Sequence, residues 1–572
     1  MKTKQTGLRT CHLPTPWSEQ PEIPWNEYPR PQLRRQSFLC LNGKWRLACN
    51  GASWGEILVP YPPESQLSGL GRTVGPEDVL EYSRRVVLPE GFRKDRVILH
   101  FGAVDQQAKV WFNDCLVGEH EGGYLPFSFD VTGLVQNVNT LRVEVVDRLD
   151  HDLPYGKQRY DRGGMWYTSV SGIWQTVWME SVPEKYIESL RLDTDTQSVT
   201  IRVQGGAAEK VLTCEGKRYA FTGDSITFRP DNPRLWSPEN PNLYRFTLES
   251  GEDKVESYFA LRKIEIRKIG KFARLCLNGA PYFFHGLLDQ GYFSDGIYLP
   301  GSPLGYTFDV QTMKDLGFNT LRKHIKIEPE RFYYDCDRLG MVVFQDLVNS
   351  GDYHYFVDTV LPNGGIKKGI THRATPRRRE IFERTARETL EHLHNHPCIL
   401  YYTLFNEGWG QFDEQRLYER MKQLEPERIW DATSGWFQNC DSDVLSEHIY
   451  FGNLQRMKAD CRPLVLSEFG GYSWSLPGHA FNLDKVYGYK KFTKGEDLEA
   501  ALVELYRRDI VSQVKKGLSA SILTQVSDVE DETNGLVSYD RKVVKVRPEK
   551  MVQIARELRA AMEEETKKGT PV

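Results

Sequence analysis

The sequence predicts a multidomain chain made of two β-sandwiches followed by a (β/α)8 barrel. Three observations favour this fold class: the chain has 572 residues, short strand-like segments fill residues 40–268, and strands alternate with helices after Gly270. Because single hydrophobic cores stop growing at about 250–300 residues, a chain of this length divides into domains. We expect domains at residues 1–183, 184–268 and 269–572.

The first region is predicted to be an all-β sandwich because turn-forming residues separate its short strands. In AKVWFND, Val110 and Phe112 fall on one face of a strand and Trp111 on the other, as a sheet with two partly covered faces requires. Residues 184–268 repeat this pattern on a smaller scale. They suit a second, immunoglobulin-like sandwich.

The third region contains eight strand-like units. They are LCLNGAPYFFHGLLD, GFNTLRKHI, GMVVFQDL, CILYYTLFNE, RIWDATSG, DVLSEHIY, RPLVLSEFGG and SASILTQVSD. Amphipathic segments lie between them; in residues 379–396, Phe382, Ala386, Leu390 and Leu393 share one helical face. Eight such units predict a closed barrel with its active site at the carboxyl ends of the strands.

Composition excludes several classes of partner. The formal net charge of −4 shows no basic excess, so we expect no nucleic-acid partner. The sequence has no apolar window long enough to span a membrane and no readable secretion signal, which predicts a cytoplasmic protein. The ten cysteines are scattered singly. We therefore expect no metal site and no cofactor.

Two of the predicted strands end in a glutamate. Glu407 follows the apolar run CILYYTLF and Asn406, and Glu468 ends the run PLVLS. The fourth and seventh strands of a barrel stand across its mouth, so the two carboxyl groups can face one volume. Such a pair hydrolyses glycosides, with retention at about 5–5.5 Å separation and inversion at about 6.5–9.5 Å. Either glutamate alone could instead cap a helix or pair with an arginine.

Four motifs resemble those of glycoside hydrolase family 2, the family of β-galactosidases, β-glucuronidases and β-mannosidases. They are NEGWG around Glu407, SEFGG around Glu468, NTLRKH at 319–324 and SGIWQTVWME at 171–180. The resemblance covers nearly the whole chain and implies a jelly-roll sugar-binding-like domain, an immunoglobulin-like domain and a barrel. It implies a retaining exo-β-glycosidase with Glu407 as general acid/base, Glu468 as nucleophile and Asn406 binding the hydroxyl beside the reacting carbon.

The strand that contains NTLRKH supplies four more candidates. Arg322 is expected to hold Glu468 ionised through a charge-assisted hydrogen bond, or else to form an ordinary barrel salt bridge. His324 resembles the family histidine that reaches sugar hydroxyls, or is structural. Lys323 and Lys326 would favour an anionic sugar or lie in solvent, and we expect solvent.

Other strand ends supply substrate-binding candidates. Asp289 is expected to accept from sugar hydroxyls or to cap its loop. The strand-end residues Trp436, His448 and Tyr450 are expected to shape the site. Gln525 lies at the end of the eighth strand. The acidic stretch from Asp528 onward is expected to be a solvated loop.

Departures from the family pattern bear on the substrate. β-Glucuronidases bind the sugar carboxylate with an Asn-x-Lys pair. The counterpart here is NLDK at 482–485, which has one residue too many between Asn and Lys. Trp166 stands where β-galactosidases and β-glucuronidases send an aspartate from the first domain into the barrel. We expect a β-galactosidase-like carbohydrate substrate, with a β-uronide as the alternative.

Two other classes remain open at this point. A sandwich protein could bind glycans without cutting them, although the presence of both glutamates argues against this. A hydrolase with two metal ions would need clustered His and Asp at strand ends, and these are not evident. A site enclosed by neighbouring domains often favours self-association, so a homo-oligomer is a further expectation.

Overall fold

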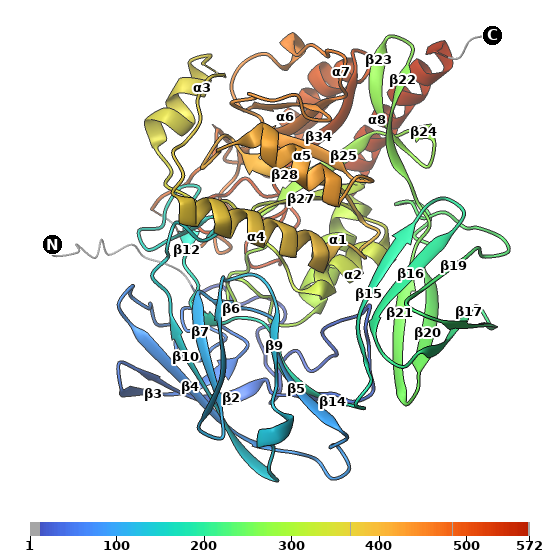
Figure 1. Ribbon diagram of the computed structural model, residues 1–572. Helices are drawn as coiled ribbons and strands as arrows, with labels where there is room; N and C mark the ends of the chain where they lie inside the picture. Colours follow the sequence, from blue (N-terminus) through green and yellow to red (C-terminus); the bar gives the residue numbers. More distant parts are fainter. Residues whose placement is uncertain (1–11, 367, 483, 570–572) are drawn as a thin grey trace.

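A computed structural model describes residues 12–366, 368–482 and 484–569. In Figure 1 the first sandwich lies below the barrel, the second sandwich lies beside it, and the barrel carries the green-yellow to red part of the chain. The two sandwiches and the barrel follow one another in the order that the sequence predicts, so the fold class is confirmed.

The first sandwich packs a six-stranded sheet against a four-stranded one. The larger sheet has the order β3 (Ala52–Val59), β2 (Gly43–Cys49), β4 (Val79–Val87), β10 (Val138–Val146), β7 (Gln107–Phe112) and β8 (Cys115–Glu121). The smaller has the order β1 (Leu39–Cys40), β14 (Val177–Val182), β5 (Arg96–Phe101) and β9 (Phe127–Asp130). Val110 and Phe112 are buried between the sheets, whereas Trp111 lies on the other face under the Arg142 guanidinium, as predicted.

Two short pairings attach the rest of this domain. Strand β6 (Val104–Asp105) pairs with β13 (Gly172–Ile173), and β11 (Gln158–Arg159) pairs in parallel with β12 (Tyr167–Thr168). A single helical turn, η1 (Thr132–Leu134), precedes β10. The β11–β12 pair lies at the end of the sandwich that faces the barrel, because Thr168 N–H donates to Glu530 at 2.9 Å.

The second sandwich packs a three-stranded sheet against a four-stranded one. Its sheets are β15 (Ile187–Thr194), β16 (Val199–Gly205) and β19 (Ser225–Phe228), and β18 (Lys217–Thr222), β17 (Glu209–Cys214), β20 (Tyr244–Ser250) and β21 (Asp253–Phe259). The next strands, β22 (Ile264–Ile269), β23 (Phe272–Leu277) and β24 (Ala280–Pro281), form a separate sheet. The β22–β23 hairpin projects beside the last helix in Figure 1.

The barrel is a parallel sheet of eight strands that nearly closes. Its strands are β25 (Phe284–Asp289), β26 (Thr320–Lys323), β27 (Val342–Asp346), β28 (Ile399–Asn406), β29 (Ile429–Ser434), β30 (Leu445–Ile449), β31 (Leu464–Gly470) and β34 (Leu518–Thr524). Strands β25 to β29 pair in chain order, β30 pairs with β31, and β34 pairs with β25 and β31, so β29 and β30 are the two edges of the sheet. Between β29 and β30, the side chain of Ser446 accepts from Gly435 N–H at 3.2 Å.

Helices cover the outside of the barrel. They are α1 (Leu304–Asp315), α2 (Glu330–Leu339), η2 (Phe356–Val360) with α3 (Leu361–Asn363), α4 (Pro376–Leu393), α5 (Glu414–Leu424), η3 (Leu454–Arg456), α6 (Gly495–Leu505), η4 (Tyr506–Ile510) with α7 (Val511–Val514), and α8 (Pro548–Gly569). A small pair, β32 (Tyr472–Ser473) and β33 (Lys490–Lys491), follows β31. The connections on either side of β30 carry at most the short turn η3, so the alternation of strand and helix lapses there.

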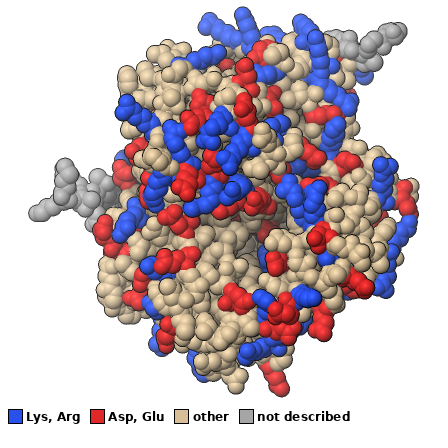
Figure 2. Space-filling view, viewed as in Figure 1, with Lys and Arg blue, Asp and Glu red and all other residues tan. Residues whose placement is uncertain are grey.

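Helix α4 shows how the local sequence forms these elements. The Thr375 side chain accepts from Arg378 N–H as an N-cap, and Pro376 occupies the first turn, where its missing N–H costs nothing. The predicted apolar face of Phe382, Ala386 and Leu390 is buried. The outward face is charged, and Figure 2 shows basic and acidic side chains interleaved on this side of the molecule.

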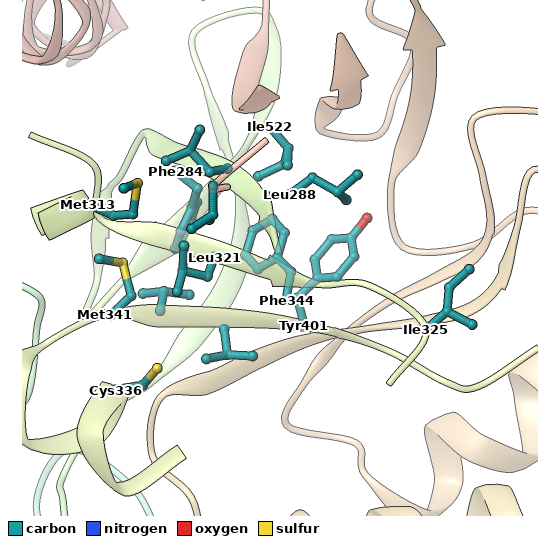
Figure 3. Packing of buried hydrophobic residues seen from close by; sticks show 14 of the residues in the cluster. Phe284, Leu288, Met313, Leu321, Ile325, Cys336, Met341, Phe344, Tyr401 and Ile522 are labelled. Carbon is teal, nitrogen blue, oxygen red and sulfur yellow. The ribbon is translucent and has the colours of Figure 1, made fainter. Parts of the chain in front are cut away.

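The core of the barrel lies between the sheet and these helices. Figure 3 shows Phe284, Leu321 and Phe344 of three strands packed with Met313 and Met341. Since a parallel sheet is covered on both faces, its strands are apolar along their length, and polar side chains cluster where the strands end. Among the described residues, no helix combines the length and apolarity needed to cross a membrane.

Asp337 of α2 ties the second sandwich to the barrel. Its Oδ2 accepts from Tyr258 Oη at 2.7 Å and from His396 Nδ1 at 2.8 Å, and its Oδ1 accepts from Cys398 N–H at 2.8 Å. Tyr258 lies on β21, so one buried carboxylate holds together parts of the chain that are far apart in sequence.

Removing the Tyr258 hydroxyl should weaken this junction. We expect Tyr258→Phe to destabilise the protein by about 1–3 kcal/mol, because a buried carboxylate loses a donor. Thermal unfolding followed by circular dichroism would measure the effect. The control is Tyr219→Phe, which removes a hydroxyl that makes no hydrogen bond within the described part of the chain; equal melting temperatures for the two variants would contradict the role of Asp337.

Candidate active site

The carboxyl ends of the barrel strands place both predicted glutamates at one rim. Glu468 lies within β31 and pairs in register with His448 of β30. Glu407 directly follows β28, and its N–H donates to Ser434 O at 2.9 Å, which extends the β28–β29 ladder. The chain then turns sharply through Gly408, whose φ is 72° and at which a Cβ would lie 2.1 Å from the Phe437 ring. Only glycine fits that turn.

The carboxyl groups of Glu407 and Glu468 converge. One oxygen of each, together with a ring nitrogen of His448, lies within 4.8 Å of the others. Retaining glycosidases hold their two carboxyl groups about 5–5.5 Å apart, whereas inverting ones leave about 6.5–9.5 Å for a water. The nearest oxygens of the two carboxyl groups thus lie no more than 4.8 Å apart, which favours the shorter, retaining geometry over the wider gap of inverting enzymes.

Arg322 of β26 lies at the centre of the site. Its Nε donates to Asp346 at 2.9 Å, Nη1 to Glu468 Oε1 at 2.9 Å and Nη2 to Asn406 Oδ1 at 2.8 Å. Burial lowers the pKa of this guanidinium, but the charges of Asp346 and Glu468 outweigh burial and raise it. Arg322 is thus a fixed cation that stabilises the negative charge of Glu468.

The second oxygen of Glu468 is also bound. Tyr450 Oη donates to Glu468 Oε2 at 2.6 Å, and the Tyr450 ring stacks on Tyr489 with ring centroids 4.0 Å apart. Both oxygens of this carboxylate accept hydrogen bonds, so its orientation is set and its charge is stabilised.

Glu407 has a different environment. Burial raises the pKa of Glu407, and the charges of Lys157, His324 and Arg322 only partly oppose this. Its Oε1 lies 2.9 Å from His448 Nδ1. Burial lowers the pKa of His448 to about 3, so the ring is neutral. Since Arg322 can only donate to His448 Nε2, at 3.2 Å, the ring proton lies on Nδ1 and faces Glu407.

His324 and Asn406 present groups to a substrate. His324 Nδ1 is 2.8 Å from Asp346 Oδ2, and burial lowers the pKa of His324. Its Nε2 has no partner among the described residues and is available to a sugar hydroxyl. Asn406 likewise uses its Oδ1 on Arg322, which leaves its amide protons free to donate.

Aromatic side chains surround the rim. The Trp436 ring lies edge-on to His448, with centroids 6.1 Å apart. Trp166 reaches the barrel from the first domain, and its ring lies 5.0 Å from that of Trp409, in the NEGWG motif, and 5.0 Å from that of Tyr353. The first domain therefore contributes directly to the wall of the site.

The lysines beside His324 are not in solvent, and that expectation is wrong. Lys323 Nζ donates to Asp289 at 2.6 Å and to Glu328 at 2.8 Å, and Lys326 Nζ binds Glu328 and two backbone carbonyls, Gly291 O and Tyr298 O. Both lysines are fully buried. Asp289 also accepts from Gly291 N–H at 2.9 Å, so its contacts fit the loop-capping alternative.

The acidic stretch after β34 is buried as well, so the expectation of a solvated loop is wrong. Glu530 accepts from Thr168 N–H and lies 3.3 Å from Arg162, and Glu532 accepts from Tyr167 Oη. Asp528 pairs with Lys545 at 2.6 Å. Gln525 donates to Asn534 at 2.8 Å and braces this loop, which locks the first domain to the barrel.

Glu407, His448 and Glu468 are also close enough to share a metal ion. A metal there would displace the hydrogen bond between His448 Nδ1 and Glu407 and the one between Tyr450 and Glu468. Glu407, His448 and Glu468 already have hydrogen-bond partners, among them Tyr450 and Arg322.

Sequence reasoning missed two residues of the site. Asp346 orients Arg322 and His324, and its position at the end of β27 would have revealed it by the strand-end rule. Lys157 comes from a loop of the first domain, and its charge acts on Glu407. No local pattern points from that loop to the barrel.

A (β/α)8 barrel whose rim holds two converging glutamates around a buried arginine defines a glycoside hydrolase. The chain belongs to glycosyl hydrolases family 2: the family's sugar binding domain matches residues 59–183, its second domain matches 186–262 and its TIM barrel domain matches 304–545.

The three relatives described next are 21–24% identical to this chain. A beta-galactosidase from Thermoanaerobacter pseudethanolicus is 24% identical over an alignment of 375 residues that covers 60% of this chain and 46% of that protein. A beta-glucuronidase from Rattus norvegicus is 23% identical over 512 residues, covering 78% of this chain and 75% of that one. The solved structure of a Faecalibacterium prausnitzii beta-glucuronidase superposes with a TM-score of 0.69 at 21% identity, over 93% of this chain and 99% of that one.

Removing the Tyr450 hydroxyl tests the environment of Glu468. We expect Tyr450→Phe to lower kcat on a β-glycoside by roughly 10-fold, because Glu468 loses a hydrogen bond of about 1–2 kcal/mol. Steady-state kinetics measure this, with Tyr472→Phe as the control at a tyrosine whose hydroxyl makes no hydrogen bond among the described residues. Full activity in Tyr450→Phe would mean that Arg322 alone holds the carboxylate.

Proposed function

We propose that this protein is a retaining, exo-acting β-glycosidase in which Glu468 is the nucleophile and Glu407 the general acid/base. The observation that carries the proposal is the pair of carboxyl oxygens within 4.8 Å of each other in unlike environments. Arg322 and Tyr450 stabilise charge on Glu468, whereas burial favours the protonated form of Glu407. This difference divides covalent attack from proton donation.

In the first step Glu468 attacks the anomeric carbon and forms a glycosyl ester. The bond between this carbon and the glycosidic oxygen breaks, and the leaving oxygen takes the proton of Glu407. Arg322 remains bound to Glu468 Oε1 and keeps the attacking carboxylate oriented. The Asn406 amide and His324 Nε2 are free to bind sugar hydroxyls during this step.

In the second step water hydrolyses the ester. Once Glu468 is esterified, its negative charge is gone, and Glu407 as a carboxylate accepts a proton from the attacking water. Water oxygen bonds to the anomeric carbon, Glu468 leaves as a carboxylate, and the β configuration is restored. His448 stays neutral throughout and donates to Glu407 from Nδ1, so it orients the acid/base.

The surroundings of the barrel mouth support action on a chain end. Trp166 and the β11–β12 pair close one side of the mouth, and Thr168 is hydrogen-bonded to Glu530 of the loop after β34. A closed side favours a terminal sugar over the interior of a polymer. A β-galactoside is the glycone that the resemblance favours, with a β-uronide as the alternative.

Two sequence-based expectations accompany this proposal and remain predictions. They are a cytoplasmic location and self-association into a homo-oligomer.

Replacing each glutamate tests the assignment. We expect Glu468→Gln to abolish hydrolysis of all nitrophenyl β-glycosides, since an amide does not form the glycosyl ester. Glu407→Gln should slow substrates with poor leaving groups by about 10²–10⁴-fold and activated aryl glycosides much less, because only the former need the proton. The control is Glu427→Gln, at an exposed position before β29. Wild-type turnover by Glu468→Gln would refute the nucleophile assignment.

The raised pKa of Glu407 predicts the pH profile. Glycosylation requires Glu407 protonated, so kcat/KM should fall as pH rises through the pKa of Glu407, at a pH above the ordinary value of 4.5. The alkaline limb should vanish in Glu407→Gln assayed on an activated substrate. An unchanged alkaline limb in that variant would assign the titration to another group.

A further inference from the structure

A lysine of the first domain enters the site without a partner of its own. Lys157 directly precedes β11 and is 8% exposed. Its Nζ makes no hydrogen bond or ion pair with any described residue, and the contact it does make is with the Trp166 ring, 5.2 Å from its centroid. The ammonium keeps some contact with solvent, so a ligand can reach it.

The other buried lysines of the described residues show what is unusual here. Lys210 donates to two carbonyls, Lys323 and Lys326 bind carboxylates, and Lys545 pairs with Asp528. Each has its ammonium compensated, as burial of a charge requires. Lys157 alone among them has no such compensation within the described part of the chain.

The positive charge of Lys157 acts on three residues around the barrel mouth. It is the charge with the largest effect on Glu407, and it also acts on His324, beyond β26, and on Glu532, in the loop after β34. The Trp166 ring that the ammonium contacts packs against Trp409 of the motif that contains Glu407, so the ammonium lies on the Trp166 side of the barrel mouth. A sugar bound between Glu407 and Glu468 would lie next to it.

The backbone around Lys157 is held firmly. Gly156 has φ of 68°, and a Cβ there would lie 2.8 Å from Ile325 O. Gln158 points to the opposite face of the strand, where its amide donates to Asp105 at 2.9 Å. The Lys157 carbonyl accepts from Tyr167 N–H at 2.9 Å. The side chain is therefore presented by a fixed scaffold.

Arg159 points to the same side of the strand as Lys157, because side chains two apart share a face. Its guanidinium lies 4.0 Å from the centre of the Trp166 ring and 5.9 Å from that of Tyr353, and it forms no ion pair with a described residue. Two cations and an indole thus line one side of the mouth. This side is suited to an anionic group.

We propose that Lys157 is a specificity residue that binds the carboxylate of a terminal uronic acid whose anomeric carbon lies between Glu407 and Glu468. The inference rests on the proposed function and deepens it. One ammonium balances one carboxylate, whereas a neutral sugar would leave a buried cation unpaired. The site would therefore prefer β-uronides to β-galactosides or β-glucosides.

The lysine of the NLDK segment does not fill this place. Lys485 is exposed. Asn482 donates to Asp531 at 2.8 Å, and its Oδ1 accepts from Asp484 N–H and Lys485 N–H, so its side chain is used by its own turn and by the loop after β34. Lys485→Met is consequently the matched control for Lys157→Met.

The experiment compares nitrophenyl β-galacturonide and β-glucuronide with the corresponding neutral glycosides. Wild type should show the higher kcat/KM on a uronide. Lys157→Met should lower kcat/KM for that uronide by about 10- to 100-fold, the worth of a charge-assisted hydrogen bond, and change the neutral substrate less than about 3-fold. Lys485→Met should behave as wild type.

Three results would overturn the proposal: a preference for the neutral glycoside, an equal loss on both substrates in Lys157→Met, or loss of uronide activity in Lys485→Met alone. Failure of the proposed function has a different signature, since Glu468→Gln would then hydrolyse like wild type. Calorimetric titration with free galacturonate and glucuronate adds a test without turnover: wild type should bind one of them, and Lys157→Met should bind it at least about 10-fold more weakly.

The pH profile separates a charge effect from a structural one. Glu468 and His448 lie beside Glu407, and the charges of Lys157, His324, Arg322 and Asp358 act on it. Removing one positive charge raises the pKa of Glu407 further, so Lys157→Met should move the alkaline limb of kcat/KM on a neutral glycoside to higher pH. A limb that stays in place would contradict the position that we assign to the ammonium.

Discussion

The buried guanidinium of Arg322 is the interaction on which the site depends. One side chain binds Asp346, Glu468 and Asn406, which come from the ends of three different strands. A guanidinium without these partners would be too costly to bury, and the two carboxylates without it would repel each other. Fold and charge are coupled here, because the barrel brings these strand ends together and the charge network in turn orients the Glu468 carboxylate.

Two like residues acquire different roles from their surroundings. Glu468 receives hydrogen bonds from Arg322 and Tyr450, whereas Glu407 faces a neutral histidine in a buried position where its pKa is raised. The neutrality of His448 matters, because a charged imidazolium beside Glu407 would favour the carboxylate and weaken the acid. Burial next to the Arg322 cation keeps that ring neutral.

The first domain contributes to the candidate site. Trp166 meets Trp409 of the NEGWG motif, the Lys157 ammonium lies against Trp166, and the buried acidic loop after β34 accepts hydrogen bonds from the β11–β12 pair. The same loop explains a failure of sequence reasoning. A run of acidic residues suggests a solvent-exposed loop when the sequence is considered alone. Here Arg162, Tyr167 and Thr168 of the first domain bind the carboxylates of this loop. Lys323 and Lys326 mislead in the same way, since their partners Asp289 and Glu328 bury them.

The sequence by itself determined the order of the domains, the apolar strands and the strand-end positions of Glu407, Glu468, Arg322 and His324. These follow from periodicity and from motifs, which are local properties of the chain. Only the tertiary structure decided which charges are paired and which are not. It buried Lys323, engaged Asp289 in its loop and left Lys157 against Trp166 without an ionic partner among the described residues, because pairing depends on contacts between residues that are distant in the sequence.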